Sequence, residues 1–553
     1  MVKKRGVDAN KHIIKYVLLI FVVLAILLIP KTNSKYLLQS STSLELKPDK
    51  YNLVVTRKVT RVHSVNDDIQ FMISNHNKYP VKIDIIYNGN IIKTGITIPA
   101  NTVNYNGKFK VPQNTYDQIV ASHGANMHIK VTSPYSVQYS NQIRVETSKP
   151  YLVNRTIQTG FLGTTIDEQD IATIKFVDEG TIPPPGVLGS FDVSDGKKGN
   201  VIAWYTKNAD DPTSYDVVIS ANGKINIKKT EFLFSNLMSL VEVDLTNTDI
   251  SEASSFRATF FNTPSLKKIK WGGINTSSIN TTFQMFAYTG LEELDLSSLD
   301  LSRVTNASSM FLDATELKTL KLDGVNTSSL TNMYSMFKNT KSLKNFNPGI
   351  LNVSRVTNMN SAFMGTGSAT SYDLSSWDVS KVVDFSSMFA EADDLKSINL
   401  SGWNVSSGEK FSNMFEKMGN IENLDLSSFT SSNANSLDKM FANSKKLKKI
   451  IFNNFTTSGV STMESMCEGL INLTDLELDN FNANSNPNIS NMLKNCKKLE
   501  KLKLNNFEFT NSSNNSNLGL DNTNNKDTDI TVKNSTEKSW LLSKYPALTN
   551  VHE

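Results

Sequence analysis

The chain has 553 residues, of which 20% are charged, and its formal net charge is +4. This length leaves room for several domains. A charge this close to balance excludes the strongly basic surface of a nucleic-acid binder, so we expect no nucleic-acid partner.

The first segment is basic and then apolar. Residues 1–12 carry lysine and arginine, and residues 13–30 are mostly apolar. The positive-inside rule places such a basic head in the cytoplasm, and the apolar run reaches the lower limit of about 17 residues for a membrane span. We predict a cytoplasmic head at 1–12 and a signal anchor at 13–30 in the cytoplasmic membrane, with the C-terminal part extracellular. No A-x-A motif follows; a cleaved signal, which would make the protein secreted, is the alternative.

Residues 36–150 have a different pattern. Short segments of alternating apolar residues, such as 81–87 and 91–98, are separated by turn residues, and Asn88-Gly89 is typical of a hairpin connection. We predict an antiparallel β-sandwich that serves as a spacer. A binding module in its own right is the alternative.

A methionine-phenylalanine pair, with some substitutions, recurs through residues 237–509. The second member of the pair is spaced by 26, 25 and then seven times 26 residues, at Phe260, Phe286, Phe311, Phe337, Phe363, Phe389, Phe415, Phe441, Cys467 and Leu493. One globular core does not produce such a period, whereas stacked repeats do. The spacing therefore predicts a solenoid with coils of about 26 residues.

Each coil has the same parts. The pattern L-x-x-L-x-L, as in Leu317, Leu320 and Leu322, predicts a strand with one buried face, and a bulky residue such as Trp377 follows at a corner. The pattern V-x-x-M-x-x-M-F, as in residues 304–311, has the spacing of one face of a short helix. Stacking would join the strands into one parallel sheet with about 4.8 Å between coils.

One part of the array departs from the pattern. Pro348 occupies a strand position, where proline removes a hydrogen bond from the ladder. Ala369 and Tyr372 give the next coil an atypical strand sequence. We expect a bulge or a local opening near residues 345–372.

Residues 510–553 close the chain. The asparagine-rich tract at 510–527 is too polar to be buried and predicts a loop. The strand-like residues 530–532 and a helix that contains Trp540 are expected to cover the last coil as a C-terminal cap.

The repeat also carries a family resemblance. The pattern D-L-S-x-[WFL]-x-x-S-x-V-T-N-M-x-x-M-F is clearest at residues 295–311 and 373–389. It resembles the BspA-type leucine-rich repeat of bacterial surface proteins, over roughly residues 171–553. The resemblance implies that residues 171–236 are the N-terminal cap of the array, and a solenoid needs such a cap because its first coil otherwise exposes an unpaired strand edge.

The predicted fold class combines these elements. It is a mixed α/β solenoid, a right-handed leucine-rich-repeat-like stack with one parallel sheet and short helices. An N-terminal antiparallel β-sandwich and a single transmembrane helix at residues 13–30 complete it.

The outward side chains of the strands form the candidate binding site. Stacking brings equivalent positions of neighbouring coils within about 5 Å of each other. The candidate protein-binding residues are Lys267, Lys270, Glu292, Asp295, Lys318, Lys321, Lys344, Asp373, Lys396, Asp425, Lys448, Glu477 and Lys503. Their signs often alternate between coils, so a solvated face that neutralises itself is the alternative.

No catalytic motif or cofactor-binding motif is found in the sequence. Cys467 and Cys496 replace core residues in neighbouring coils, and we expect buried thiols with no metal. The resemblance implies a non-enzymatic surface protein that adheres to a protein ligand on a host or a neighbouring cell. A structural envelope scaffold or a self-associating spacer is the alternative, and the sequence predicts no oligomeric state.

Overall fold

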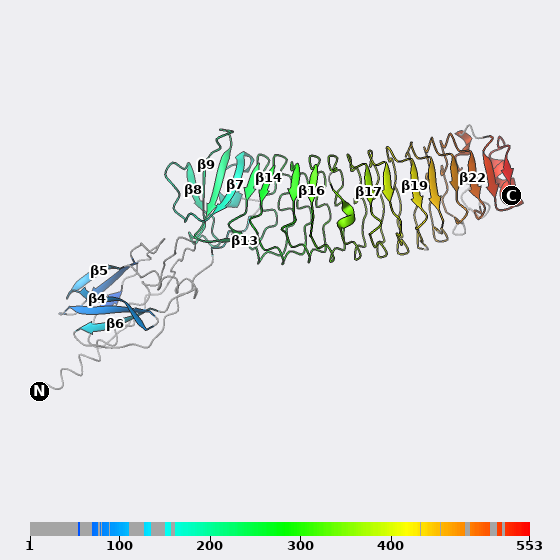
Figure 1. Cartoon of the computed structure of the whole chain (residues 1–553). Coiled ribbons are helices and arrows are strands. Elements are labelled where there is room, and N and C mark those ends of the chain that lie inside the picture. The colour runs from blue at the N-terminus through cyan, green and yellow to red at the C-terminus, as the bar shows by residue number, and fades with distance from the viewer. Residues whose placement is uncertain are drawn as a thin grey trace. The chain divides into compact units, whose positions relative to one another are not determined.

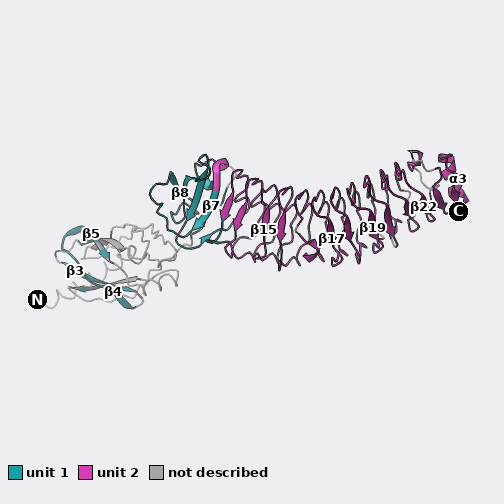
Figure 2. Cartoon of the chain, turned by 45° about the horizontal axis from the view of Figure 1, so that its top comes forward, with its two compact units in different colours: residues 1–165, 173–228, 244–249 teal, residues 166–172, 229–243, 250–553 magenta. Residues whose placement is uncertain are grey.

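The computed structural model describes residues 53–55, 69–75, 78, 80–87, 89–109, 127–133, 150–155, 161–344, 346–431, 433–453, 455–481, 487–508, 517–522 and 526–553. Two compact units make up the chain (Figure 2). Unit 1 consists of residues 1–165, 173–228 and 244–249, and unit 2 of residues 166–172, 229–243 and 250–553.

The first strands of unit 1 form two antiparallel sheets of three strands. One sheet has the order β1 (Leu53–Val55), β2 (Ile69–Asn75), β5 (Thr102–Phe109), and the other the order β4 (Asn90–Ile98), β3 (Val81–Tyr87), β6 (Met127–Ser133). Buried polar groups are satisfied within these sheets: Asp84 accepts from the Thr94 hydroxyl and the Gly95 N–H, both at 2.8 Å.

Unit 1 also contains a second group of strands. Neighbours in one sheet are β7 (Ile171–Val177), β10 (Tyr215–Ser220), β9 (Ile202–Lys207) and β8 (Gly189–Asp192). A separate parallel pair is formed by β11 (Ile225–Asn226) and β13 (Thr248–Asp249). Two 3-10 helices, η2 (Phe161–Gly163) and η3 (Glu168–Asp170), lie close before β7 in the chain.

Unit 2 is a solenoid whose strands follow one another in chain order (Figure 1). These strands are β12 (Glu242–Asp244), β14 (Lys268–Lys270), β15 (Glu293–Asp295), β16 (Thr319–Lys321), β17 (Ser371–Asp373), β18 (Ser397–Asn399), β19 (Asn423–Leu426), β20 (Lys449–Phe452), β21 (Asp475–Glu477), β22 (Lys501–Leu504), β23 (Asp529–Val532) and β24 (Val551–His552). Paired strands are parallel, and the partners of Leu294 and Leu476 are Leu320 and Leu502. Each repeat is thus in register with the next.

The repeated phenylalanines stack in one file inside the solenoid. Neighbouring ring centroids lie 5.2–5.8 Å apart and their planes agree within 18°, along Phe234, Phe260, Phe286, Phe311, Phe337, Phe363, Phe389, Phe415 and Phe441. Cys467 and Leu493 take the next two equivalent positions and are also fully buried. The stacking of 26-residue coils that the spacing predicts is confirmed.

The segment predicted as a short helix in each coil consists of tight turns instead. The N–H groups of Met310 and Leu312 donate to carbonyls three residues earlier, whereas those of Ser309 and Phe311 donate to carbonyls of the next coil. Ser309 and Asp313 have φ values of 54° and 52°, in the left-handed region that an α-helix excludes. Consecutive turns also direct every third side chain inward, so the apolar spacing does not distinguish them from a helix.

A second parallel ladder, one residue wide, runs beside these turns. It joins Ser255, Thr281, Asn306, Asn332, Asn358, Asp384, Lys410, Ser436, Thr462 and Asn488. This ladder and the turn hydrogen bonds satisfy backbone groups between coils, so the fold needs no helix there.

The predicted fold class is therefore wrong in its helices. In the described part of residues 237–509, the only helix is the 3-10 helix η4 (Pro348–Ile350), so the solenoid is a β-structure and not a mixed α/β one. The prediction of a transmembrane helix is not supported either: none of the described helices has the length and apolar character needed to cross a membrane. Residues 13–30 lie outside the described residues.

The strand ladder is also not one continuous sheet. Among the described residues it divides into β14 with β12, β15 with β16, β17 with β18, and β19 through β24. Pro348 begins η4 where a strand would lie between β16 and β17, as its missing N–H predicts. The expectation of an irregular strand at Tyr372 is wrong, because this residue lies in β17 and is only 4% exposed.

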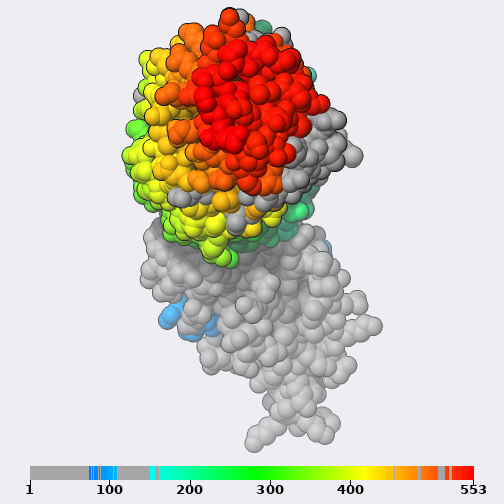
Figure 3. Space-filling view, turned by 90° about the vertical axis from the view of Figure 1, so that its right-hand side faces the viewer, coloured from blue at the N-terminus to red at the C-terminus, as the bar shows by residue number. Residues whose placement is uncertain are grey.

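The C-terminal segment lies at the end of the stack that faces the viewer in Figure 3. It contains the short 3-10 helix η5 (Leu520–Asn522), β23, the α-helix α3 (Ser535–Lys544) and β24. Asn534 caps α3 by accepting from the Glu537 N–H at 3.0 Å. The Leu541 side chain is fully buried.

Candidate functional site

The outward side chains beside and within the strands of unit 2 form a surface that we call the strand face. In β15 the central Leu294 is buried, while Glu293 and Asp295 on either side of it are exposed, as strand alternation requires. All 13 predicted site residues lie on this face. Eleven are exposed, and Glu292 and Lys503 are half-buried.

Glu292 connects three coils of the strand face. One carboxylate oxygen lies 2.6 Å from Lys318 Nζ, and the other lies 3.4 Å from Lys267 Nζ. Hydrogen bonds from Lys318 and then from Lys267 lower the pKa of Glu292, and Glu292 in turn raises the pKa of Lys318. These three side chains therefore neutralise much of one another's charge.

Further ion pairs join neighbouring coils. Lys503 Nζ lies 2.7 Å from Glu477, and Lys448 Nζ lies 2.8 Å from Glu422. Lys270 Nζ lies 2.5 Å from Glu242, a residue that the sequence does not single out. Pairs this exposed contribute little to stability, but they fix which charges remain available to a partner.

The aspartates of the strand face stabilise the turns that follow the strands. Asp295, Asp373 and Asp425 each accept a hydrogen bond from the backbone N–H two residues later, at 2.9, 3.1 and 2.9 Å. Hydrogen bonds from Ser297 and Ser375 lower the pKa values of Asp295 and Asp373. These carboxylates hold the turn after the strand, so they are poor candidates for ligand contacts.

Three of the predicted site lysines differ from the other five. Lys321, Lys344 and Lys396 are exposed, and no carboxylate among the described residues forms an ion pair with them, although Lys321 contributes to the lowered pKa of Asp295. Asp373, the predicted site residue between Lys344 and Lys396 along the chain, already accepts from Asn399 and Ser375. The strand face therefore carries three exposed lysines that form no ion pair among the described residues.

A shallow depression marks the first coils of the strand face, between β14 and β15, which do not pair with each other. The indole N–H of Trp271 donates to the Asp295 carbonyl at 3.1 Å, bridging the two coils where the ladder is open. The residues that line the depression are Lys267, Lys268, Ile269, Trp271, Glu293, Leu294, Asp295, Thr319 and Lys321. The site predicted from the sequence does not include Lys268 and Glu293, although their alternation with buried residues marks them as outward-facing.

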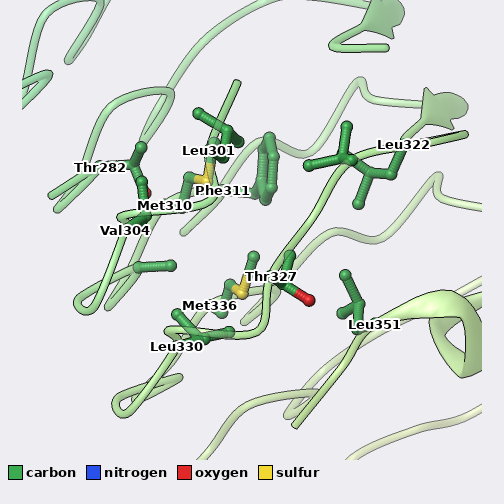
Figure 4. Close-up of a pocket in the computed structure, with 12 residues that line it drawn as sticks. Thr282, Leu301, Val304, Met310, Phe311, Leu322, Thr327, Leu330, Met336 and Leu351 are labelled. Atoms are coloured by element: carbon green, nitrogen blue, oxygen red, sulfur yellow. The ribbon is translucent and has the colours of Figure 1, made fainter. Parts of the chain in front are cut away.

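A cavity inside the solenoid offers no catalytic site. The side chains in Figure 4 surround it: Leu301, Val304, Met310, Phe311, Leu322, Leu330, Met336 and Leu351, with the hydroxyls of Thr282 and Thr327. The corner position holds Leu299, Val325 and Leu351 in these coils, whereas later coils carry Trp377 and Trp403. The smaller corner residues explain the unfilled space of about 20 Å³.

The two cysteines lie in adjacent coils and are buried. Cys496 Sγ donates to the Cys467 carbonyl at 3.2 Å. Burial raises the pKa of Cys496 to about 12 and raises that of Cys467 well above its usual value. Both therefore remain thiols that fill the core.

Comparison with known proteins gives a family match. The family described as "Mycoplasma protein of unknown function, DUF285" matches residues 228–350, 320–423, 342–453 and 409–533, which together are more than half of the chain. A search of curated proteins found no match. Among solved structures, the chain is similar to a leucine rich cell surface protein from Faecalibacterium prausnitzii A2-165, with 18% identity, coverage of 63% of this chain and 96% of that one, and a TM-score of 0.30.

The family match follows the repeats. The four overlapping matches begin and end within residues 228–533, the part of the chain that contains the phenylalanine file. The predicted BspA-type resemblance is thus supported only in part, because the family match covers the repeats but its description names no repeat type. The chain belongs to the DUF285 family.

Proposed function

We propose that the protein binds other proteins without catalysing a reaction, and that it does so through the strand face of its solenoid. The observation that carries this proposal is the positive charge at Lys321, Lys344 and Lys396, which are exposed and form no ion pair with a described carboxylate. A partner with exposed carboxylates complements this charge and gains specificity and association rate from it.

The rigidity of the solenoid favours this role. Backbone hydrogen bonds join successive coils on the strand side and on the turn side. A rigid surface can add many weak contacts without the cost of ordering itself during association. The proposed partner is a protein of a host or a neighbouring cell, and the proposal places the solenoid at the cell surface, as the basic and then apolar sequence of residues 1–30 favours.

The test uses the immobilised full-length chain. Fibronectin, laminin, collagen, fibrinogen and the chain itself are passed over the wild type and over the triple variant K321E/K344E/K396E. We expect at least one matrix protein to bind the wild type and to lose at least tenfold in affinity for the triple variant.

The matched control reverses three exposed lysines outside the strand face. K341E/K445E/K497E has the same change in net charge, and none of the three lysines forms an ion pair with a described carboxylate. Equal loss in both variants would show only a general effect of charge. If the chain retained itself and no matrix protein, a self-associating scaffold would replace the proposed function.

A further inference from the structure

A second surface of the solenoid lies on its turn side and is rich in aromatic residues. We call it the aromatic patch, and it consists of Phe232, Arg257, Phe261, Phe283, Tyr288 and Tyr334. Tyr288 and Tyr334 are 41% and 44% exposed, so both rings are open to solvent. The patch is absent from the predicted site because only the strand positions were considered as outward-facing.

Arg257 is held at the centre of the patch by two rings. Its guanidinium carbon lies 5.5 Å from the ring centre of Phe232 in the preceding coil and 5.5 Å from that of Phe283 in the following coil. Both distances are within the range of a cation–π interaction. The guanidinium of Arg257 therefore lies near a ring of each neighbouring coil.

No carboxylate among the described residues pairs with Arg257, although its side chain is exposed. The nearby aromatic pair is fixed as well, since Phe261 and Tyr288 meet edge to face at 5.5 Å. Burial first, and then the charge of Asp313 and a hydrogen bond with it, raise the pKa of Tyr288, and Asp313 also accepts from Asn339 at 2.8 Å. The patch therefore presents one pre-oriented cation among aromatic rings.

The patch is confined to the first coils. Three residues before each member of the phenylalanine file, these coils carry Arg257, Phe283, Ser308 and Tyr334. The later coils carry Asn360, Ser386, Ser412, Asp438, Glu464 and Ser490 at the same position. Since all coils share one backbone, the aromatic residues are not required for folding of the turn.

From this arrangement we infer that the aromatic patch is a docking site for a protein segment in which an aspartate or glutamate is flanked by apolar residues. The carboxylate pairs with the Arg257 guanidinium, in the bidentate geometry that arginine favours. The apolar neighbours of that carboxylate pack on Tyr288 and Phe283. The site is independent of the strand face and of the function proposed for it.

The composition of the patch supports a protein as the occupant. Interface cores are enriched in aromatic residues and arginine and depleted in lysine and glutamate, and the strongest contacts cluster on tyrosine, tryptophan and arginine. The strand face has the opposite composition. From Phe232 to Tyr334 the patch extends over four coil spacings, or roughly 19 Å, which suits a short peptide segment.

The experiment selects ligands from a library of random dodecapeptides displayed on phage, with the full-length chain as bait. Selected peptides are then synthesised, and their affinities are measured by fluorescence anisotropy for the wild type, R257Q, R257K and R355Q. Arg355 is the matched control, because it is also exposed and no ring among the described residues stacks on it. Sodium hyaluronate serves as an acidic probe that is not a protein.

We expect the selected peptides to carry an aspartate or glutamate beside aromatic or aliphatic residues. R257Q should lower the affinity for these peptides at least tenfold. R257K should lower it several-fold, because lysine lacks the planar fork of the guanidinium, and R355Q should leave it unchanged. Selected peptides that lack an acidic residue, or that bind R257Q as well as the wild type, would overturn the inference. So would binding of hyaluronate that depends on Arg257 when no peptide shows such dependence. Strand-face variants leave the expected result unchanged, so failure here and failure of the proposed function can be told apart.

Discussion

The rings of Phe415 and Phe441 lie parallel, with their centroids 5.8 Å apart, although 26 residues separate them in the chain. Each ring packs against a ring of a neighbouring coil, so neighbouring coils share one core. A core built this way depends on nearest neighbours, so a local change should act mainly through the two adjoining coils.

Thr282 offers a test of the interior beside the cavity. Its hydroxyl is buried and has no hydrogen-bond partner among the described residues. T282V keeps the shape and removes the unsatisfied group, so we expect urea unfolding to show a gain of about 1 kcal/mol. In the same coil the Thr289 hydroxyl donates to the Phe286 carbonyl at 3.0 Å, and T289V should instead lose about 1 kcal/mol. Equal effects of the two changes would contradict this account.

The unfilled corner at Val325 predicts a stabilising substitution. V325L adds one methylene group beside a cavity of about 20 Å³ and should raise the unfolding free energy by about 0.5–1 kcal/mol. V379L is the control, because Val379 is fully buried in a coil whose corner is filled by Trp377, and overpacking there should cost about 1–3 kcal/mol. A loss of stability in V325L would show that the space is not available.

The ion pairs of Glu292 predict a dependence of stability on pH. Its pKa is lowered in the folded state, so its contribution is present above the unfolded pKa of about 4.3 and is lost as pH falls through the folded pKa. The thermal midpoint of E292Q should therefore fall less steeply than that of the wild type below pH 4. Because the pairs are exposed, 0.5 M NaCl should reduce the difference. E293Q, at the neighbouring position without an ion pair among the described residues, should follow the wild type.

The buried thiols predict slow modification. The raised pKa values of Cys467 and Cys496 leave almost no thiolate at pH 8, and burial keeps reagents away. Ellman's reagent should label neither cysteine in the folded chain within minutes and both after denaturation in guanidinium chloride. Rapid labelling of the folded chain would mean that the last coils open.

The periodicity of the sequence was enough to predict the stacked coils. The Met-Phe spacing identifies Phe311 and Phe337 as neighbours, because only repetition in space explains repetition at 26 residues. It could not distinguish turns from helices, since both direct every third residue inward. The two left-handed positions of this turn are occupied by Ser309 and Asp313 and not by glycine, so the sequence does not mark them as turn positions.

The sequence predicted where the candidate site lies, but not which of its lysines form ion pairs. Alternation around Leu320 places Lys321 on the outside, yet which lysines are neutralised depends on side-chain geometry, as the pairing of Lys318 with Glu292 shows. The aromatic patch was missed because only the strand positions were considered as outward-facing, although stacking also brings Arg257 and Phe283, at equivalent turn positions of successive coils, together.

The most direct test of the shared interior compares F337A with Y334A in the full-length chain. Phe337 is fully buried between Phe311 and Phe363, whereas Tyr334, three residues earlier, is 44% exposed. Urea unfolding should show a loss of about 3–5 kcal/mol for F337A and a change of less than about 0.5 kcal/mol for Y334A. Indistinguishable unfolding curves for the two variants would contradict a solenoid built on one continuous file of phenylalanines.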